Sequence, residues 1–252
     1  MEAGAADRPE QLREILRMEK DGQVSGGIYH KIQIELTWNS NHMEGSTLTP
    51  EQTRYIYETQ MLPPGDAAVN VDDIVETANH FRCVDRIIEE AADSLTEDLI
   101  RELHLILKNG TSDSRKSWFR TGDWKQLPNE VGGQPTSRPD CVAADMAHLL
   151  ADYEERASGT LEDLLDFHYR FERIHPFQDG NGRVGRLILF KECLRWNLVP
   201  FIISEDLRLY YYRGLGMWEQ ERGWLRDTCL TAQDRFRTYL DYFGIAYDTD
   251  CC

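Results

Sequence analysis

The stretch that decides the fold is His175-Pro176-Phe177-Gln178-Asp179-Gly180-Asn181-Gly182-Arg183-Val184-Gly185-Arg186. It holds a base, a carboxylate, three glycines and two arginines, and the apolar run Leu187-Ile188-Leu189-Phe190 follows at once. Glycines let the backbone turn with few steric limits. A helix that begins there adds unpaired N–H donors and the positive end of its dipole. The stretch therefore predicts an anion site at the start of a helix.

The side chains of this stretch indicate which anion is bound. Arg183 and Arg186 lie one helical turn apart and carry permanent positive charge that suits phosphate. His175 is the side chain most easily poised as a base near neutral pH. Asp179 supplies a hard oxygen ligand of the kind that Mg²⁺ takes alongside substrate phosphates. The alternative is a polar turn between two helices, but such a turn needs neither the His-Pro-Phe entry nor two arginines.

The same stretch resembles the signature of the Fic (Fido) family, His-Pro-Phe-x-Asp/Glu-Gly-Asn-Gly-Arg-x-x-Arg, at every specified position. The resemblance implies an all-α fold, a Fic-type helical bundle with an inserted β-hairpin flap. It also implies a Mg²⁺-dependent protein adenylyltransferase, which moves AMP from ATP to a Tyr, Thr or Ser hydroxyl of a protein target or of itself. His175 would be the base and Asp179 the metal ligand. The nucleotide would contact Phe177, Asp179, Gly180, Asn181, Gly182, Arg183 and Arg186.

A second stretch, Ser40-Asn41-His42-Met43-Glu44-Gly45, fits the family's inhibitory pattern Ser/Thr-x-x-x-Glu-Gly/Asn. Ser40 and Glu44 are four residues apart, so they share one face of a helix. The resemblance implies that Glu44 pairs with Arg186. An arginine held by a carboxylate cannot clamp the γ-phosphate, and Glu44 also repels the anionic tail of ATP. The alternative is a solvated glutamate at a helix end.

Residues 109–139 are rich in Gly, Pro, Ser and Asn and predict a loop and hairpin, the only long stretch without helical periodicity. The segment Gly122-Asp123-Trp124-Lys125 to Pro128-Asn129-Glu130-Val131-Gly132-Gly133 resembles the Fic flap. This resemblance implies an exposed strand edge that holds a target segment by β-augmentation. The target-docking residues would be Lys125, Leu127, Asn129 and Val131. An ordinary surface hairpin is the alternative.

Two tyrosines, Tyr211 and Tyr212, follow the signature on a later helix. They resemble the pair that contacts adenosine in the family, and aromatic rings can stack on adenine or pack on ribose. Packing inside the helical core is the alternative, and the sequence leaves both open. Three further histidines on predicted helices, His80, His104 and His168, are interpreted as packed side chains, since nothing nearby supplies the rest of a metal-ligand set.

The remaining chain predicts helices by its apolar spacing and its caps. They run from about 9 to 20, 26 to 43, 50 to 62, 72 to 92, 96 to 108, 140 to 156, 161 to 174, 183 to 197 and 224 to 243, and a further helix starts at about 204 and carries Tyr211 and Tyr212. We expect an N-terminal extension over 1–25, with residues 1–9 disordered. One Fic domain would follow over 26–245, with the inhibitory helix at about 26–45 and the flap at about 115–135. A tail over 246–252 would end the chain.

Composition narrows the classes of partner. Net charge is 28 − 44 = −16, which disfavours nucleic acid and anionic membranes as partners. No apolar run approaches the ~20 residues that span a bilayer, and the first residues do not read as a signal peptide. The six cysteines lack Cys-x-x-Cys spacing, so we expect a cytoplasmic protein with reduced thiols. Cys251-Cys252 is interpreted as part of an inert tail. A homo-oligomer is left open.

Two other functions remain open at this stage. The same site could remove AMP, with Glu44 orienting water, or could transfer another nucleotide. Alternatively, the chain could be a non-catalytic module that senses a nucleotide or binds a partner through the flap. The presence of both His175 and Asp179 favours the enzyme, because binding alone needs no base.

Overall fold

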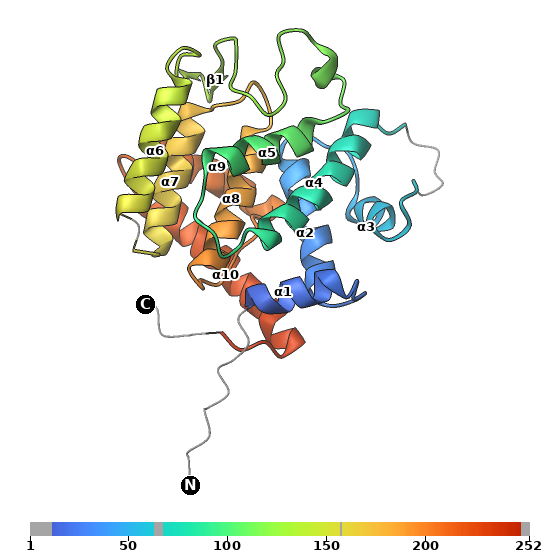
Figure 1. Cartoon of the computed structure of the whole chain (residues 1–252). Helices are drawn as coiled ribbons and strands as arrows, with labels where there is room; N and C mark the ends of the chain where they lie inside the picture. Colours follow the sequence, from blue (N-terminus) through green and yellow to red (C-terminus); the bar gives the residue numbers. More distant parts are fainter. Residues whose placement is uncertain (1–11, 63–67, 157, 248–252) are drawn as a thin grey trace.

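The computed structural model describes residues 12–62, 68–156 and 158–247. The expectations for residues 1–9 and for Cys251-Cys252 lie outside these residues. The all-α class is confirmed (Figure 1), and the described residues form these elements in chain order: α1 (Leu12–Asp21), α2 (Ile28–Met43), α3 (Pro50–Thr59), α4 (Val71–Glu89), α5 (Glu97–Lys108), η1 (Asp113–Arg115), β1 (Glu130–Val131), β2 (Gln134–Pro135), α6 (Val142–Arg156), α7 (Leu161–Ile174), α8 (Asn181–Arg195), η2 (Glu205–Leu207), α9 (Arg208–Met217) and α10 (Gly223–Phe243).

Helix α8 is the centre of the bundle. Of its 15 residues, 13 are buried, so it is covered on all sides, unlike an amphipathic surface helix. Its neighbours are α2, α4, α5 and α7, and in Figure 1 its orange ribbon runs through the middle of the molecule. The signature residues form the N-terminus of this buried helix. Because the surrounding helices pack against it, they contribute side chains to that end.

The ends of α3 and α7 follow from local sequence. Thr49 caps α3 through a reciprocal capping box with Gln52, and Pro50 occupies the first turn, where its missing N–H costs nothing. Thr160 forms the same kind of box with Asp163 at the start of α7. The last residue of α7 is Ile174, because Pro176 disfavours helical geometry at the residue before it.

The predicted hairpin is present but short. Glu130 pairs with Pro135 and Val131 with Gln134, both antiparallel. The two residues between the strands, Gly132 and Gly133, have φ of +57° and +74°. Such a turn needs positive φ at both central positions, which glycine adopts without strain. Figure 1 shows this hairpin at the end of the molecule where α6 begins, and the adjacent antiparallel helix α7 ends there as well.

The boundary difference that bears on the site is at α8, which begins at Asn181 rather than at about Arg183. Gly180 precedes it as the cap residue, with φ of +83°. The earlier start brings Asn181 and Gly182 into the first turn, so their N–H groups become part of the helix N-terminus. Among the helices of residues 12–62, 68–156 and 158–247, none is long and apolar enough to cross a membrane.

Candidate active site

His175 stands where α7 stops. Its backbone has φ of +51°, in the left-handed region, and its N–H still donates to Phe171 O over 2.9 Å. The imidazole Nδ1 is buried and lies 3.7 Å from Glu172 Oε2. Burial opposes the charge on Glu172, but the neighbouring His175, His168 and Arg186 lower the pKa of this carboxyl below its usual value. The imidazole therefore has an anionic neighbour on its Nδ1 side.

The turn after His175 delivers the free N–H groups of α8. The first intrahelical bond is donated by Val184 N–H to Gly180 O over 3.0 Å, so the N–H groups before it have no helical partner. The amide of Asn181 does not join them, contrary to expectation. Its Oδ1 accepts from Phe177 N–H and its Nδ2 donates to Phe177 O, both over 2.8 Å. Asn181 therefore braces the turn, and the groups that the turn leaves for a predicted anion are backbone N–H groups.

Asp179 is held from one side by two cations. Its Oδ2 accepts from Lys108 Nζ over 2.6 Å and from an Arg183 nitrogen over 3.1 Å. Burial would raise the pKa of this carboxyl, but Arg183 and Lys108 outweigh it and lower the pKa to about 2. The side chain remains 48% exposed. Asp179 is thus an ionised carboxylate with an open face, which suits a Mg²⁺ ligand.

Arg183 points away from the predicted phosphate cradle. Its guanidinium is buried and pairs with Glu76 of α4 as well as with Asp179. Glu76 also accepts from Lys108 over 2.5 Å, and Lys108 pairs in addition with Asp113. Arg183 was expected to contact the nucleotide directly, but here it belongs to a buried charge cluster that fixes Asp179.

His104 of α5 supports the same turn. Its Nδ1 accepts from Gly122 N–H over 2.9 Å, so Nε2 carries the proton and donates to Asp179 O over 3.1 Å. The ring stacks on Phe177 at 3.9 Å between centroids. Burial and the nearby Lys108 lower the pKa of His104 to about 3. The interpretation of His104 as a packed, neutral histidine is confirmed, and Phe177 is a buried packing residue.

Arg186 meets the C-terminal end of α2. It donates from Nε to Ser40 Oγ over 3.0 Å, and from one terminal nitrogen to Ser40 O over 2.9 Å and Glu44 Oε1 over 2.7 Å. Burial works against the charge of Arg186, but the Glu44 carboxylate raises its pKa above the usual value. The pair predicted from the sequence is therefore formed, and Gly45 follows with φ of +99° as α2 ends.

Glu44 also lies over the first turn of α8. A Cβ built on Gly182 would collide with Glu44 Oε1 and would lie 2.9 Å from an Arg186 nitrogen. Glycine at this position is what allows the carboxylate to approach. A carboxylate at a helix N-terminus takes the position that favours anions. Glu44 thus occupies the space that the sequence predicts for the phosphates.

Tyr211 and Tyr212 lie on different sides of α9 and therefore have different surroundings. Tyr211 is buried and makes a short hydrogen bond of 2.5 Å between its hydroxyl and His168 Nε2, so it packs in the core together with that packed histidine. Tyr212 is 40% exposed, and its hydroxyl lies 3.5 Å from Met43 O, at the end of α2. Only Tyr212 has an accessible ring beside the site.

The flap residues also divide into two kinds. Leu127 and Val131 are exposed, as a docking edge requires. Lys125 is not: it is 2% exposed and lies outside both strands, so the expected exposed edge beginning at Lys125 is wrong. Asn129 turns its side chain inward and donates from Nδ2 to Phe177 O over 3.0 Å. Lys125 and Asn129 anchor the flap, and of the four predicted docking residues Leu127 and Val131 present their side chains to solvent.

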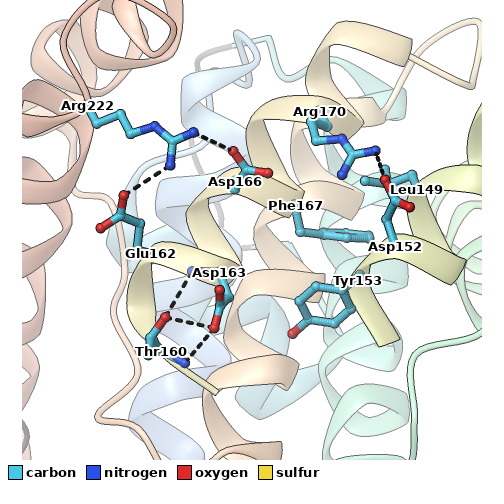
Figure 2. A pocket seen from close by; sticks show the side chains of 10 residues that line it. All are labelled: Leu149, Asp152, Tyr153, Thr160, Glu162, Asp163, Asp166, Phe167, Arg170 and Arg222. Carbon is cyan, nitrogen blue, oxygen red and sulfur yellow. Dashed lines mark hydrogen bonds and ion pairs between the residues drawn. The ribbon is translucent and has the colours of Figure 1, made fainter. Parts of the chain in front are cut away.

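A separate cavity of about 390 Å³ lies between α6, α7 and the segment before α10 (Figure 2). Four acidic side chains line it, but their charges are matched: Asp152 pairs with Arg170, Arg222 with both Glu162 and Asp166, and Asp163 caps α7 through Thr160. It contains no residue of the signature. We therefore place the functional site at the N-terminus of α8.

The sequence did not single out several residues that complete the site. Glu76, Lys108 and Glu172 come from three different helices and belong to no short motif. Amphipathic spacing assigns such charged positions to the solvent-exposed face of a helix. Their burial becomes visible only when the helices are packed together. Lys108 is 2% exposed, whereas a lysine near the end of a helix is ordinarily interpreted as a solvated cap.

The fold and site together define a class of helical proteins. In this class a glycine-rich turn leads into a buried helix, and a carboxylate from a separate helix, here Glu44 of α2, covers the start of that helix. Residues 94–192 match the family model described as Fic/DOC family. This part of the chain therefore carries a Fic/DOC family domain. The matched residues run from the turn before α5 to the C-terminal part of α8, so they include the flap and the complete signature.

Curated relatives agree with this assignment. The chain is 28% identical over 193 residues to protein adenylyltransferase fic-1 of Caenorhabditis briggsae. This alignment covers 75% of this chain and 35% of that protein. It is 27% identical over 184 residues to protein adenylyltransferase Fic of Nematostella vectensis, covering 71% and 41%. The chain therefore spans well under half the length of these relatives.

Solved structures share the fold. A Fic domain containing signaling protein from Bacteroides thetaiotaomicron is 25% identical, with a TM-score of 0.67 and coverage of 92% of this chain and 91% of that one. Fic-1 (residues 134–508) from Caenorhabditis elegans is 22% identical, with a TM-score of 0.67 and coverage of 92% and 72%. The second likeness shows the fold alone.

Proposed function

We propose that this chain is a protein adenylyltransferase that transfers AMP from ATP to a Tyr, Thr or Ser hydroxyl of a protein target or of itself. One observation carries the proposal: a single turn joins His175 to a glycine-lined helix N-terminus, with the ionised Asp179 between them. The names of the curated relatives support the same activity. We propose this reaction for the domain, whatever further segments the longer relatives contain.

His175 is the general base in this mechanism. The imidazole takes the proton from the target hydroxyl, and the oxygen attacks the α-phosphorus in line. The bond from the α-phosphorus to the bridging oxygen breaks, and pyrophosphate leaves with that electron pair. Positioning and charge neutralisation supply most of the rate in reactions of this kind. Glu172, on the Nδ1 side of the ring, stabilises the imidazolium that forms.

The phosphates bind to the backbone at the start of α8, where N–H groups precede the first helical bond. Asp179 would hold Mg²⁺, because its carboxylate is ionised and half exposed, and both of its cationic partners bind at Oδ2. Mg²⁺ supplies charge neutralisation between the phosphates when it is bound. No cluster of three or more His, Cys, Asp or Glu side chains in the described part of the chain could hold a metal ion. The remaining metal ligands are therefore substrate oxygens and water.

Glu44 represses this reaction in our proposal. Its carboxylate pairs with Arg186 and lies against Gly182, so it competes with the γ-phosphate for both the cation and the helix N-terminus. ATP that binds despite Glu44 would have its α-phosphate turned away from His175. Movement of the end of α2 away from α8 would restore activity.

The test uses the purified chain, Mg²⁺ and ATP labelled on either the α- or the γ-phosphate. We expect the Glu44→Gly variant to incorporate α-label at least ten times faster than the unsubstituted chain. His175→Ala in the Glu44→Gly background should lower that rate about 100-fold or more. An equally active double variant would exclude His175 as the base.

The same assay separates the other functions. Incorporation of γ-label instead would indicate phosphorylation. Loss of α-label from a pre-labelled protein, dependent on Glu44, would indicate removal of AMP. If the Glu44→Gly variant binds ATP but transfers no label to itself or to added cell proteins, the chain is a nucleotide-binding module. Magnesium dependence is tested by repeating the assay with excess chelator.

A further inference from the structure

Lys125 is a buried lysine without an anionic partner. It is 2% exposed, and within residues 12–62, 68–156 and 158–247 no carboxylate forms an ion pair with it. Its Nζ donates to Asn129 Oδ1 over 2.7 Å, to Thr136 Oγ1 over 2.6 Å and to Ile174 O over 3.1 Å. An ammonium group has three donors, and each meets a neutral acceptor here.

Such a placement is unfavourable for the charge itself. Burial lowers the pKa of Lys125 to about 8, and the negative charge of Asp145 on α6 opposes this shift. A buried charge needs hydrogen bonds in every direction to be tolerated. The acceptors of those bonds come from two separate segments of the chain. The side chain of Lys125 therefore links these two segments.

The two segments are the base of the hairpin and the peptide on either side of His175. Asn129 precedes β1 and Thr136 follows β2, so the ammonium group ties together both ends of the hairpin. Its bond to Ile174 O reaches the residue before His175. The backbone N–H of Lys125 donates to Pro176 O over 2.8 Å, which is the residue after His175. One residue therefore brackets His175 on both sides.

Two further bonds continue this connection. Asn129 Nδ2 donates to Phe177 O over 3.0 Å, and Leu127 N–H donates to Gln178 Oε1 over 3.1 Å. His175 itself has a left-handed backbone, which a non-glycine residue keeps only where its surroundings hold it. The bonds from Lys125 to the carbonyls before and after it are such a restraint.

We propose that Lys125 is a positioning residue that fixes the exposed edge of the hairpin relative to the His175 imidazole. The inference rests on the proposed function, in which a target segment pairs with the hairpin and presents its hydroxyl to His175. Without Lys125, the hairpin and the His175 turn would still fold but would lose their fixed separation. Transfer to a protein would then fall, while ATP would bind as before, because none of the bonds of Lys125 reaches the α8 N-terminus.

The test compares Lys125→Met with Lys116→Met, each in the Glu44→Gly background. Lys116 lies in the same connecting segment but is exposed, forms its ion pair with Asp113 and lies over the Trp118 ring, away from the hairpin. Three quantities are measured. They are the hydrogen exchange of the backbone amides at positions 125, 127 and 136, the Kd for Mg²⁺-ATP, and the incorporation of α-label into protein at saturating ATP. Methionine retains the length of the side chain and removes its charge and donors.

For Lys125→Met we expect the three amides to exchange at least tenfold faster. Labelling should fall at least tenfold, with the Kd for Mg²⁺-ATP within twofold and the melting temperature within a few degrees. Lys116→Met should change none of these. Unchanged amide exchange, or an equal loss of ATP binding and labelling, would overturn the proposal.

A second variant covers the case in which Lys125→Met does not fold. Thr136→Val removes one of the three acceptors and keeps the side-chain shape. It should accelerate exchange of the Leu127 amide at least threefold, and unchanged exchange in Thr136→Val would likewise overturn the proposal. Exchange does not depend on the reaction. If the Glu44→Gly parent transfers no AMP, the proposed function fails, whereas the exchange result still decides whether Lys125 anchors the hairpin.

Discussion

The Arg186 guanidinium donates to Glu44 Oε1 over 2.7 Å and so joins two residues that are 142 positions apart. Arg186 is almost fully buried, whereas Glu44 is 30% exposed. Breaking such a pair from the Glu44 side leaves a buried cation without its counter-charge. The contact is therefore both an inhibitory element, as we propose, and a contribution to the stability of the nucleotide-free protein.

The first prediction concerns that dual role. Glu44→Gln should lower the free energy of unfolding of the nucleotide-free chain by about 1–3 kcal/mol, less than a fully buried pair would lose because Glu44 is partly exposed. Mg²⁺-ATP should then raise the melting temperature more in Glu44→Gln than in the unsubstituted chain, because phosphate replaces the missing carboxylate. Thermal denaturation with and without Mg²⁺-ATP measures both effects.

The matched control is Glu35→Gln, on the same helix α2. Glu35 pairs with Lys31 at the surface, so its loss should cost under about 1 kcal/mol and leave the response to Mg²⁺-ATP unchanged. An equal response to Mg²⁺-ATP in Glu44→Gln and in the unsubstituted chain would mean that Glu44 and the phosphates do not compete.

The second prediction concerns Lys108, the buried cation beside Asp179. Lys108→Met removes the cation that Glu76, Asp113 and Asp179 share and leaves Arg183 as the cation paired with Glu76 and Asp179, so proton binding to Asp179 becomes more favourable. The pKa of Asp179 should rise from about 2 toward or above its ordinary value. Carboxyl ¹³C chemical shifts followed as a function of pH measure this change. Lys116→Met, which removes an exposed partner of Asp113 only, should leave the titration of Asp179 in place.

The third prediction is a loss of stability in mild acid. Burial lowers the pKa of His80 and His104 to about 3 and that of His168 to about 4, against 6.5 in the unfolded chain. Below pH 6.5 the unfolded chain therefore takes up protons that the folded chain does not, and stability falls as the pH falls. At pH 5 each histidine contributes about 2 kcal/mol to this loss, at 1.36 kcal/mol for each pKa unit.

Urea denaturation at pH 7 and pH 5 tests this expectation. His80→Gln should reduce the loss of stability between the two pH values by about 2 kcal/mol, because one of the three imidazoles no longer titrates. His148→Gln replaces an exposed histidine and serves as the control for a histidine-to-glutamine substitution. If His80→Gln and the unsubstituted chain lose the same free energy, His80 is not held neutral by the fold.

Sequence reasoning succeeded where the deciding groups are neighbours in the chain. The signature places His175, Asp179 and the start of α8 within one turn, so local rules on glycine, proline and helix ends were enough. The all-helical class followed from apolar spacing for the same reason. The contact between Glu44 and Arg186 is the exception, because it is long-range and came from the family resemblance alone.

What the sequence could not predict has a common physical origin, which is the direction of a side chain. Asn181 and Arg183 belong to the predicted site, but Asn181 braces its own turn and Arg183 faces α4. Tyr211 and Tyr212 differ by about 100° around their helix, so one is buried and the other exposed. Lys125 lies inside because its acceptors come from residues up to 49 positions away. No local pattern carries that information.

The last prediction concerns Gly182, where the backbone must be bare. A methyl group there would meet Glu44 Oε1 and an Arg186 nitrogen, so Gly182→Ala should displace the Glu44 carboxylate. The same methyl group would fill the space that the phosphates need at the α8 N-terminus. Gly182→Ala should therefore break the inhibitory contact and still fail to activate: in the Glu44→Gly background it should weaken Mg²⁺-ATP binding at least tenfold. Gly216→Ala is the control, because a methyl group at that helical glycine meets nothing within 4 Å. Titration calorimetry measures both affinities, and a Gly182→Ala variant that binds Mg²⁺-ATP as tightly as its parent would show that the phosphates bind elsewhere.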